Sequence, residues 1–334
     1  MNTQRNTTLE LMKLLASYAV VFIHVLFYGR FGIIVDAIAR FAVPFFFLVS
    51  GFFSYRIAPE KILKRAKHIL YLFIFGMVCY NIMKMLQHVL VSDMDGILVF
   101  LHDYIDIKAL LIMMLFNKPA HGIYLWYLLA TIYVYVVFYF ATVHHANERT
   151  VFSVCVGLLC LQLLLGEFGF IFPERPPVFL VRNFLFMGIP FFGFGLMAKK
   201  YEQTLRHIPN ALLIISAAFG ILATILSRLL LGESQLYVGS LFILFPLVII
   251  FIKYPHIKQP RIFSELAGCS TYIYIFHVMV AYVLEVLYKF LGFDRGSSIE
   301  LQMLHPIFVC IISTIVAYII CKIINTIFRN AGNR

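Results

Sequence analysis

The chain has 334 residues, of which 62% are hydrophobic and 13% are charged, and its formal net charge is +11 at pH 7. An average soluble protein carries roughly 25% charged residues, so this composition excludes an ordinary soluble enzyme and indicates a polytopic membrane protein. The positive charge does not indicate a nucleic-acid partner, because the Lys and Arg residues stand mostly in short loops between apolar segments, as in cytoplasmic loops of membrane proteins.

Ten apolar runs, each about long enough to cross a bilayer as a helix, follow one another along the chain. They cover 9–28, 33–55, 66–87, 121–142, 150–166, 179–198, 208–230, 236–253, 265–290 and 304–326. Their connections are short except for 88–120, so we predict an all-α, polytopic membrane bundle of about ten transmembrane helices that forms one domain over residues 1–334. Most Lys and Arg residues fall in alternate connections, which predicts that both termini are cytoplasmic.

The first run carries four polar residues on one helix face: Glu10, Lys13, Ser17 and His24. At 100° per residue, Lys13 and His24 lie about 20° apart around the helix and roughly 16 Å apart along it, and the other two lie within about 40° of His24. Ionisable groups are costly in hydrocarbon and usually face a protein cavity, so this stripe predicts a functional site. A neutral imidazole is a good general base for a hydroxyl nucleophile. The alternative is a core histidine bonded to a neighbouring helix.

The second run begins with a possible ion pair and ends in a small, polar break. Asp36 and Arg40 are four residues apart and can pair, or Arg40 can point inward as a fixed cation that contacts substrate. Ser50 and Gly51 allow a ligand to approach closely. The alternative for these two residues is tight helix packing.

The long connection 88–120 mixes acidic residues with apolar ones, among them Asp95 and Asp106 beside Leu98 and Ile105. This length and mixed polarity predict an amphipathic helix that lies on the outer surface. It would serve as a structural lid or as an element that recognises the acceptor.

The later runs each contain one or two candidate functional residues. Trp126, the only tryptophan, is a substrate contact or an interfacial anchor, and Arg182 is an outer substrate clamp or a boundary charge. A kink is expected at Pro190. Tyr274 and His277 bring a second pair of polar groups into the ninth run, where a buried histidine indicates function.

All six cysteines lie within apolar runs, and none stands in a Cys-x-x-Cys pattern. This arrangement indicates neither a disulfide framework nor a zinc site. We therefore expect chemistry that uses no bound metal.

Five of these features together resemble the acyltransferase-3 family of integral membrane acyltransferases. They are the ten-residue spacing between Lys13 and His24, the acidic Glu10, the segment RFAVPFFFLVSGF (40–52), LWYL (125–128) and the tyrosine-rich segment that ends at His277. The likeness covers nearly the whole chain. The family most often has Arg where Lys13 stands and Asp where Glu10 stands, and Lys lacks the guanidinium fork.

The resemblance implies a bacterial, multi-pass protein of the plasma or inner membrane, surrounded by membrane lipid. It implies transfer of an acyl group, commonly acetyl, from cytosolic acyl-CoA (acetyl-CoA) to a hydroxyl of a cell-surface polysaccharide or envelope precursor, with no permanently bound cofactor. By the resemblance, His24 is the catalytic base and Glu10 and Lys13 support it or the donor. Arg40 would help to hold the acyl or acceptor group.

We assign the remaining candidates to binding. The phosphates of the donor would be met by cytoplasmic cations, namely Lys13, Lys64 and Arg65. Candidate substrate contacts are Arg40, Ser50, Trp126, Arg182, Tyr274 and His277.

Two segments of the chain also suggest a second possible function. LWYL and RNFLFMGIPFF (182–192) are similar to the membrane part of vancomycin-resistance serine racemases, which is associated with serine supply. The alternative function is therefore transport of a small molecule such as a serine-like amino acid. The sequence contains no soluble racemase domain, which removes the strongest support for this alternative.

Overall fold

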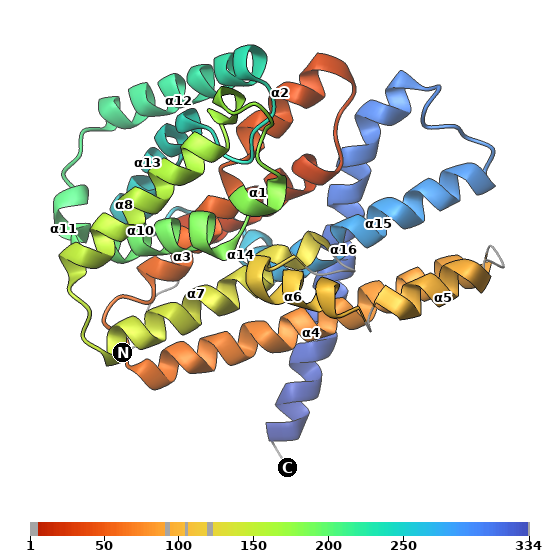
Figure 1. Ribbon diagram of the computed structural model, residues 1–334, viewed down its shortest axis with the longest axis horizontal. Helices are drawn as coiled ribbons and strands as arrows, with labels where there is room; N and C mark the ends of the chain where they lie inside the picture. Colours follow the sequence, from red (N-terminus) through yellow and green to blue (C-terminus); the bar gives the residue numbers. More distant parts are fainter. Residues whose placement is uncertain (1–5, 91–93, 104–105, 119–122, 333–334) are drawn as a thin grey trace. The chain divides into compact units, whose positions relative to one another are not determined.

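The structure is a computed structural model that describes residues 6–90, 94–103, 106–118 and 123–332. Every regular element of these described residues is a helix, as Figure 1 shows. The prediction of an all-α membrane bundle is confirmed, because nine helical segments within the described residues are long and apolar enough to cross a membrane.

The nine segments match nine of the ten predicted runs in order. They are Thr7–His24, Gly29–Phe52, Pro59–Val89, Trp126–Val143, Glu148–Leu165, Val178–Lys200, Asn210–Leu231, Ser270–Phe290 and Ile299–Ile324. The remaining run, 236–253, forms α13 (Val238–Lys253), an apolar helix of 16 residues that is shorter than the other nine. At about 1.5 Å per residue it reaches roughly 24 Å, less than the roughly 30 Å of a bilayer core.

Three predicted runs are interrupted. The second divides into α2 (Gly29–Ala39) and α3 (Ala42–Phe52), with Arg40 at the break. The ninth begins with a separate short helix, α14 (Arg261–Gly268), before α15 (Ser270–Phe290).

The third interruption lies in the run around Pro190. Here α9 (Val178–Val181) is followed by a π-helical turn, η3 (Phe184–Gly188), and then by α10 (Ile189–Lys200). Pro190 occupies the first turn of α10, where its missing N–H costs little. The irregular backbone therefore precedes the proline.

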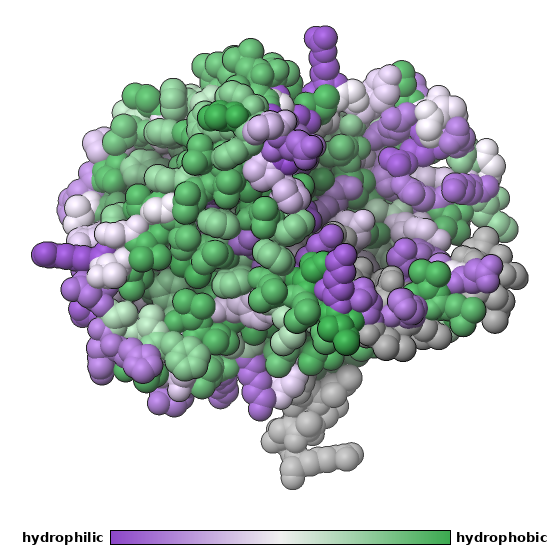
Figure 2. All heavy atoms as spheres, viewed as in Figure 1, coloured by the Kyte–Doolittle hydropathy of each residue, from purple (hydrophilic) through white to green (hydrophobic). Residues whose placement is uncertain are grey.

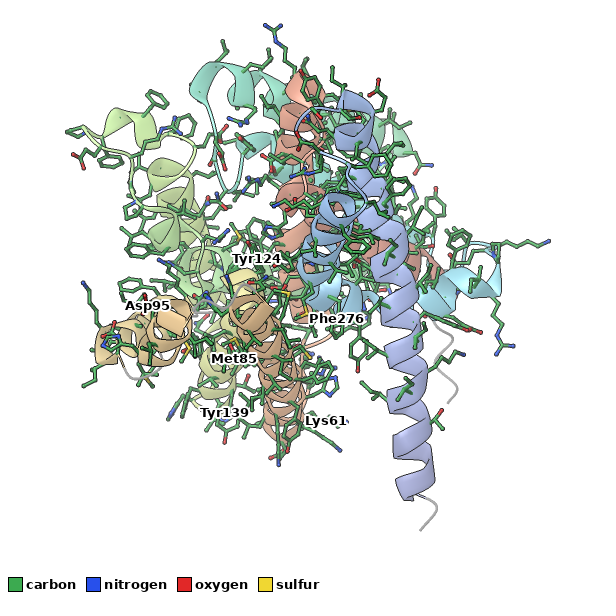
Figure 3. The ribbon with its side chains drawn as sticks, turned by 90° about the vertical axis from the view of Figure 1, so that its right-hand side faces the viewer. Lys61, Met85, Asp95, Tyr124, Tyr139 and Phe276 are labelled. Atoms are coloured by element: carbon green, nitrogen blue, oxygen red, sulfur yellow. The ribbon has the colours of Figure 1, made fainter. Side chains whose placement is uncertain are left out.

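The connection 88–120 forms two helices rather than one, α5 (Met94–Asp103) and α6 (Ile107–Phe116). Asp106 caps α6 by accepting hydrogen bonds from the backbone N–H groups of Lys108 and Ala109. Residues 91–93, 104–105 and 119–122 of this connection lie outside the described residues. Figure 3 shows Asp95 on α5 and both Lys61 and Met85 on α4 (Pro59–Leu90).

The chain divides into two compact units, which are described separately. The first unit combines Met1–Phe46 with Tyr201–Arg334. In it, α1 (Thr7–His24) packs against α2, α14, α15 and α16 (Ile299–Gly332). Its core includes Val21, Ile273 and Val309. The helices α12 (Asn210–Leu231) and α13 form its most extensive pair, side by side in Figure 1.

The second unit is Phe47–Lys200. Its main helix pairs are α4 with α7 (Trp126–Val143) and α8 (Glu148–Leu165) with α10. Short helices complete the chain: η1 (Ile123–Leu125) and η2 (Gly169–Ile171) in this unit, and α11 (Glu202–Leu205) in the first.

Large apolar side chains are exposed along the membrane-length helices of both units. On α12 they include Ile214, Ile215 and Leu230, each at least 64% exposed. Figure 2 shows hydrophobic residues over much of the face in view. Such continuous apolar surface is expected where lipid, rather than water, contacts the protein.

Candidate active site

The polar stripe of the first helix is anchored at its start. Asn6 caps α1 by accepting a hydrogen bond from the backbone N–H of Leu9, and the Thr7 and Thr8 hydroxyls donate to the carbonyls of Ile257 and Tyr254. These bonds occupy groups at the beginning of α1 and tie it to the segment before α14. The helix that carries Glu10, Lys13, Ser17 and His24 is thus held at one end by side-chain caps.

Within the stripe, Ser17 is fully buried and its hydroxyl donates to the carbonyl of Lys13. Glu10, Lys13 and His24 are all half-buried. The predicted face therefore combines a buried hydroxyl with three partly accessible ionisable groups. Its role in catalysis stays a prediction.

The two histidines predicted separately from the first and ninth runs lie together. The ring centroids of His24 and His277 are 5.3 Å apart, with 34° between the ring planes. His277 is fully buried, and the Tyr274 ring lies 6.1 Å from it. The contact joins α1 to α15, two helices that are far apart in the sequence and belong to the same unit.

The hydrogen bonding of His277 defines its tautomer. Its Nδ1 lies 2.7 Å from the carbonyl oxygen of Tyr274. A carbonyl oxygen can only accept, so Nδ1 carries the proton and Nε2 of the neutral ring is an acceptor. Among the described residues, Nε2 has no hydrogen-bond partner. His277 thus offers an acceptor nitrogen within the cluster that contains His24.

His24 occupies the last turn of α1. Its side chain therefore lies at the end of α1 opposite to the Asn6 cap, next to the ring of His277.

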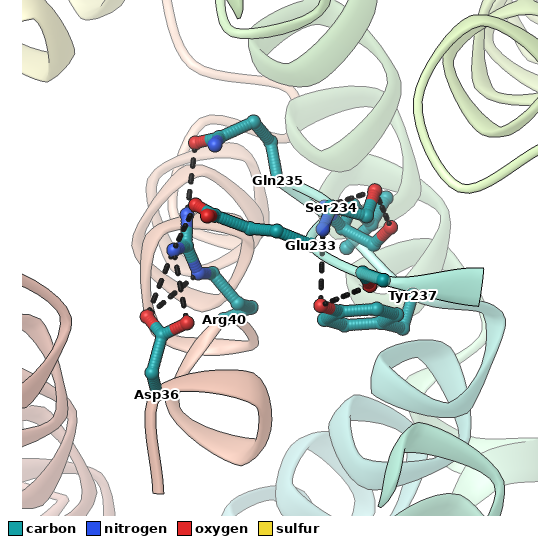
Figure 4. A network of polar contacts seen from close by, with 8 residues as sticks. Asp36, Arg40, Glu233, Ser234, Gln235 and Tyr237 are labelled. Atoms are coloured by element: carbon teal, nitrogen blue, oxygen red, sulfur yellow. Dashed lines mark hydrogen bonds and ion pairs between the residues drawn. The ribbon is translucent and has the colours of Figure 1, made fainter. Parts of the chain in front are cut away.

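Arg40 lies in a buried network of ion pairs (Figure 4). Its Nε and Nη2 donate to the two carboxylate oxygens of Asp36 at 3.0 and 3.1 Å, so the predicted pair is confirmed. Its Nη1 donates to Gln235 at 2.9 Å and its Nη2 to Glu233 at 3.2 Å. Arg40 is 7% exposed and Asp36 4% exposed. The guanidinium joins the end of α2 to the loop between α12 and α13, and its predicted contact with substrate stays a prediction.

The other candidates belong to the second unit. Ser50 contacts the Tyr127 side chain by a hydrogen bond, and Gly51 packs directly on the backbone of α10, as the tight-packing alternative predicts. Lys64 is exposed on α4. Arg65 donates to the Phe53 carbonyl and to Ser54, each at 2.9 Å.

Trp126 and Arg182, also in this unit, meet in a cation–π contact. The Arg182 guanidinium carbon lies 5.5 Å from the centroid of the Trp126 ring. Trp126 is 4% exposed, which places most of its ring inside the protein rather than at an interface with solvent. The structure therefore brings together two residues that the sequence singled out independently.

Sequence reasoning missed two residues that organise these surroundings. Glu233 belongs to the Arg40 network, and nothing in the local sequence distinguishes it from a solvated loop acid. Asn117 is fully buried and has a left-handed backbone with φ of 45°. The signal for Asn117 was present: Asn followed by Lys-Pro is typical of a helix C-terminus.

The model of the acyltransferase-3 family, described as an acyltransferase domain, matches residues 6–322. This chain belongs to the acyltransferase-3 family. The match runs continuously through the residues of both units and includes every candidate residue discussed above. No curated protein and no solved structure matches the chain.

Membership makes the protein an acyltransferase, and its apolar helices make it a multi-pass membrane enzyme. The acyltransferase therefore works in a lipid environment and transfers its acyl group to an acceptor. The link to the membrane part of serine racemases receives no support from these matches.

Proposed function

We propose that this acyltransferase transfers an acyl group, commonly acetyl, from cytosolic acyl-CoA to a hydroxyl group of a cell-surface glycan or envelope precursor in a bacterial cell membrane. The observation that carries the proposal is the contact between His24 and His277 at the end of the polar stripe of α1. This places a candidate base in a partly buried, polar cluster within a chain of an acyltransferase family.

In this proposal, His24 removes the proton from the acceptor hydroxyl while the hydroxyl oxygen attacks the thioester carbonyl carbon. The carbon–sulfur bond then breaks, and the CoA thiolate takes the proton from the His24 imidazolium, so the products are an ester and a thiol. His277, with Tyr274, holds the ring of His24 in place.

The donor is assigned to the beginning of the same helix. Lys13 stands eleven residues before His24, about 16 Å along α1, a distance that the pantetheine arm of CoA can span. We therefore assign the CoA phosphates to Lys13, with Glu10 supporting it. Lys64 and Arg65 in the second unit stay separate candidates for donor binding, and Arg40, Ser50, Trp126 and Arg182 stay candidates for contact with the acyl group or the acceptor.

Substitution of His24 tests the proposal. His24→Gln in the purified protein should reduce transfer from labelled acetyl-CoA by about 100-fold or more, because a positioned general base contributes roughly 10²–10⁴-fold. The matched control is His305→Gln, which removes a different histidine of the same unit. His305 is buried, and its Nδ1 lies 3.3 Å from the Tyr288 hydroxyl oxygen. This control should retain transfer.

Two results would contradict the assignment. The first is full transfer activity in a His24→Gln protein that size-exclusion chromatography shows to be folded. This result would mean that His24 is not the catalytic base. Accumulation of labelled serine in vesicles without any CoA would instead support the alternative, transport of a serine-like amino acid. The family match favours acyl transfer over that alternative.

A further inference from the structure

A cavity outside the histidine cluster has the composition of a ligand site. It lies in the second unit, between the end of α6, the start of α7 and the segment around α9, and its volume is about 370 Å³. Its walls combine three aromatic rings, two cations and one amide: Phe116, Trp126, Phe179, Lys118, Arg182 and Asn117. We call this cavity the Trp126 pocket.

Each cation of the Trp126 pocket lies over an aromatic ring. Arg182 lies 5.5 Å from the Trp126 centroid, and Lys118 lies 5.8 Å from the Phe179 centroid. Phe116 meets Phe179 edge to face, with ring centroids 5.1 Å apart. Two positive charges, each held over an aromatic ring, thus line one cavity.

The backbone of the pocket is held by two buried asparagines. The Asn117 carboxamide accepts a hydrogen bond from the Phe184 N–H and donates to the Trp126 carbonyl. The Asn183 carboxamide accepts from Leu185 and Phe186 and donates to the carbonyls of Phe179 and Leu180. The Asn117 bonds connect the three chain segments that line the pocket, and the Asn183 bonds fix the backbone beside Arg182, so the arrangement is built into the fold.

The combination of cations and aromatic rings in this pocket suits a ligand that carries a negative charge and contains a ring. Fixed cations bind phosphate through charge-assisted hydrogen bonds, and flat aromatic walls bind the face of a ring. A volume near 370 Å³ is at the lower end of ligand pockets, which suits one small unit rather than an extended chain.

We propose that the Trp126 pocket binds a sugar that carries a phosphate group, with the phosphate at Lys118 and Arg182 and the sugar ring against the aromatic side chains of the pocket. The proposal rests on the function proposed above, because a phosphorylated sugar belongs to the glycan or envelope-precursor class proposed there for the acceptor. It adds a phosphate group to that class and assigns its binding to the second unit.

The single tryptophan of the chain makes the pocket directly observable, since all tryptophan fluorescence comes from Trp126. The full-length protein in detergent is titrated with glucose 1-phosphate, with potassium chloride at matched ionic strength as the blank. We expect a saturable change in Trp126 emission. Arg182→Gln and Lys118→Gln should each weaken the apparent affinity by about tenfold or more.

Matched controls separate the pocket from general charge effects. Lys108→Gln removes an exposed cation near the beginning of α6, the helix that precedes Lys118, and should leave the titration unchanged. Arg182→Lys keeps the charge and should retain part of the affinity, which covers the case in which Arg182→Gln does not fold.

The other possible results would contradict either the whole proposal or one part of it. Unchanged affinity in folded Arg182→Gln, or no saturable response to glucose 1-phosphate, would overturn it. An equal response to glucose would show that the phosphate group does not contribute to binding. An equal response to glycerol 1-phosphate would assign the pocket to a lipid headgroup instead of a sugar. His24→Gln should bind normally, so a failure of the transfer reaction and a failure of this pocket are distinguishable.

Discussion

At the scale of single residues, the Asp36–Arg40 pair shows how costly charges are stabilised inside this protein. Both side chains are less than 10% exposed, and the guanidinium makes two hydrogen bonds to the carboxylate. Glu233 contacts the same guanidinium, yet its side chain is 57% exposed. A buried partner cannot be replaced by water, whereas an exposed one can.

These two carboxylates should therefore contribute unequally to stability. Asp36→Asn is expected to lower the free energy of unfolding by about 3–5 kcal/mol, because it leaves the Arg40 charge buried without its main partner. Glu233→Gln should cost about 1 kcal/mol or less. Denaturant unfolding in detergent, followed by Trp126 fluorescence, measures both. Equal losses for the two variants would show that burial does not govern the network.

At the scale of helices, glycines determine how closely α3 and α10 approach. A Cβ on Gly51 would overlap the carbonyl oxygen of Phe192, and a Cβ on Gly195 would overlap that of Leu48. The backbones of α3 and α10 are therefore in direct contact, which small residues allow between membrane helices. This explains why a small residue follows Ser50 in the second run.

Gly51→Ala should push these helices apart and destabilise the protein by about 1–3 kcal/mol, the usual cost of overpacking. The matched variant is Gly157→Ala in the middle of α8, where an added Cβ meets nothing within 4 Å. That change should be neutral or stabilising by up to about 1 kcal/mol, since alanine favours helix. Thermal unfolding of both variants gives the comparison, and an unaffected Gly51→Ala protein would contradict the close-packing argument.

At the scale of the whole molecule, the distribution of Lys and Arg predicts which loops face the cytoplasm. His256 and Ser297 stand on either side of the segment that contains α15, and both are exposed. The loop of His256 lies among Lys253, Lys258 and Arg261, and it is therefore predicted to be cytoplasmic.

Cysteine labelling tests this orientation. In a variant without the six native cysteines, Ser297→Cys should react with a membrane-impermeant maleimide added to intact cells, whereas His256→Cys should react only after the cells are opened. The reverse pattern would invert the predicted topology and place the Lys13 end of α1 outside, where cytosolic acyl-CoA could not reach it.

The sequence by itself determined the fold class and the order of the apolar helices along the chain. Long apolar runs can satisfy their backbone hydrogen bonds in lipid only as helices, so composition and run length were sufficient for nine of the segments. It also determined the polar face of α1 and the Asp36–Arg40 pair, because both depend on spacing within one helix. The short length of α13 within the run 236–253 and the breaks near Arg40 and Cys269 were not predicted, since hydropathy does not record local caps and turns.

Only the tertiary structure decided which distant residues meet. Three contacts join segments that are separate in the sequence. They are the contact of His24 with His277, the ion pair of Glu233 with Arg40, and the pocket lined by Lys118, Trp126 and Arg182. Helical periodicity gives the direction of a side chain on its own helix, but not which helix that face will contact. That choice is made by packing, where small residues such as Gly51 and Gly195 allow one pair of helices to approach closely.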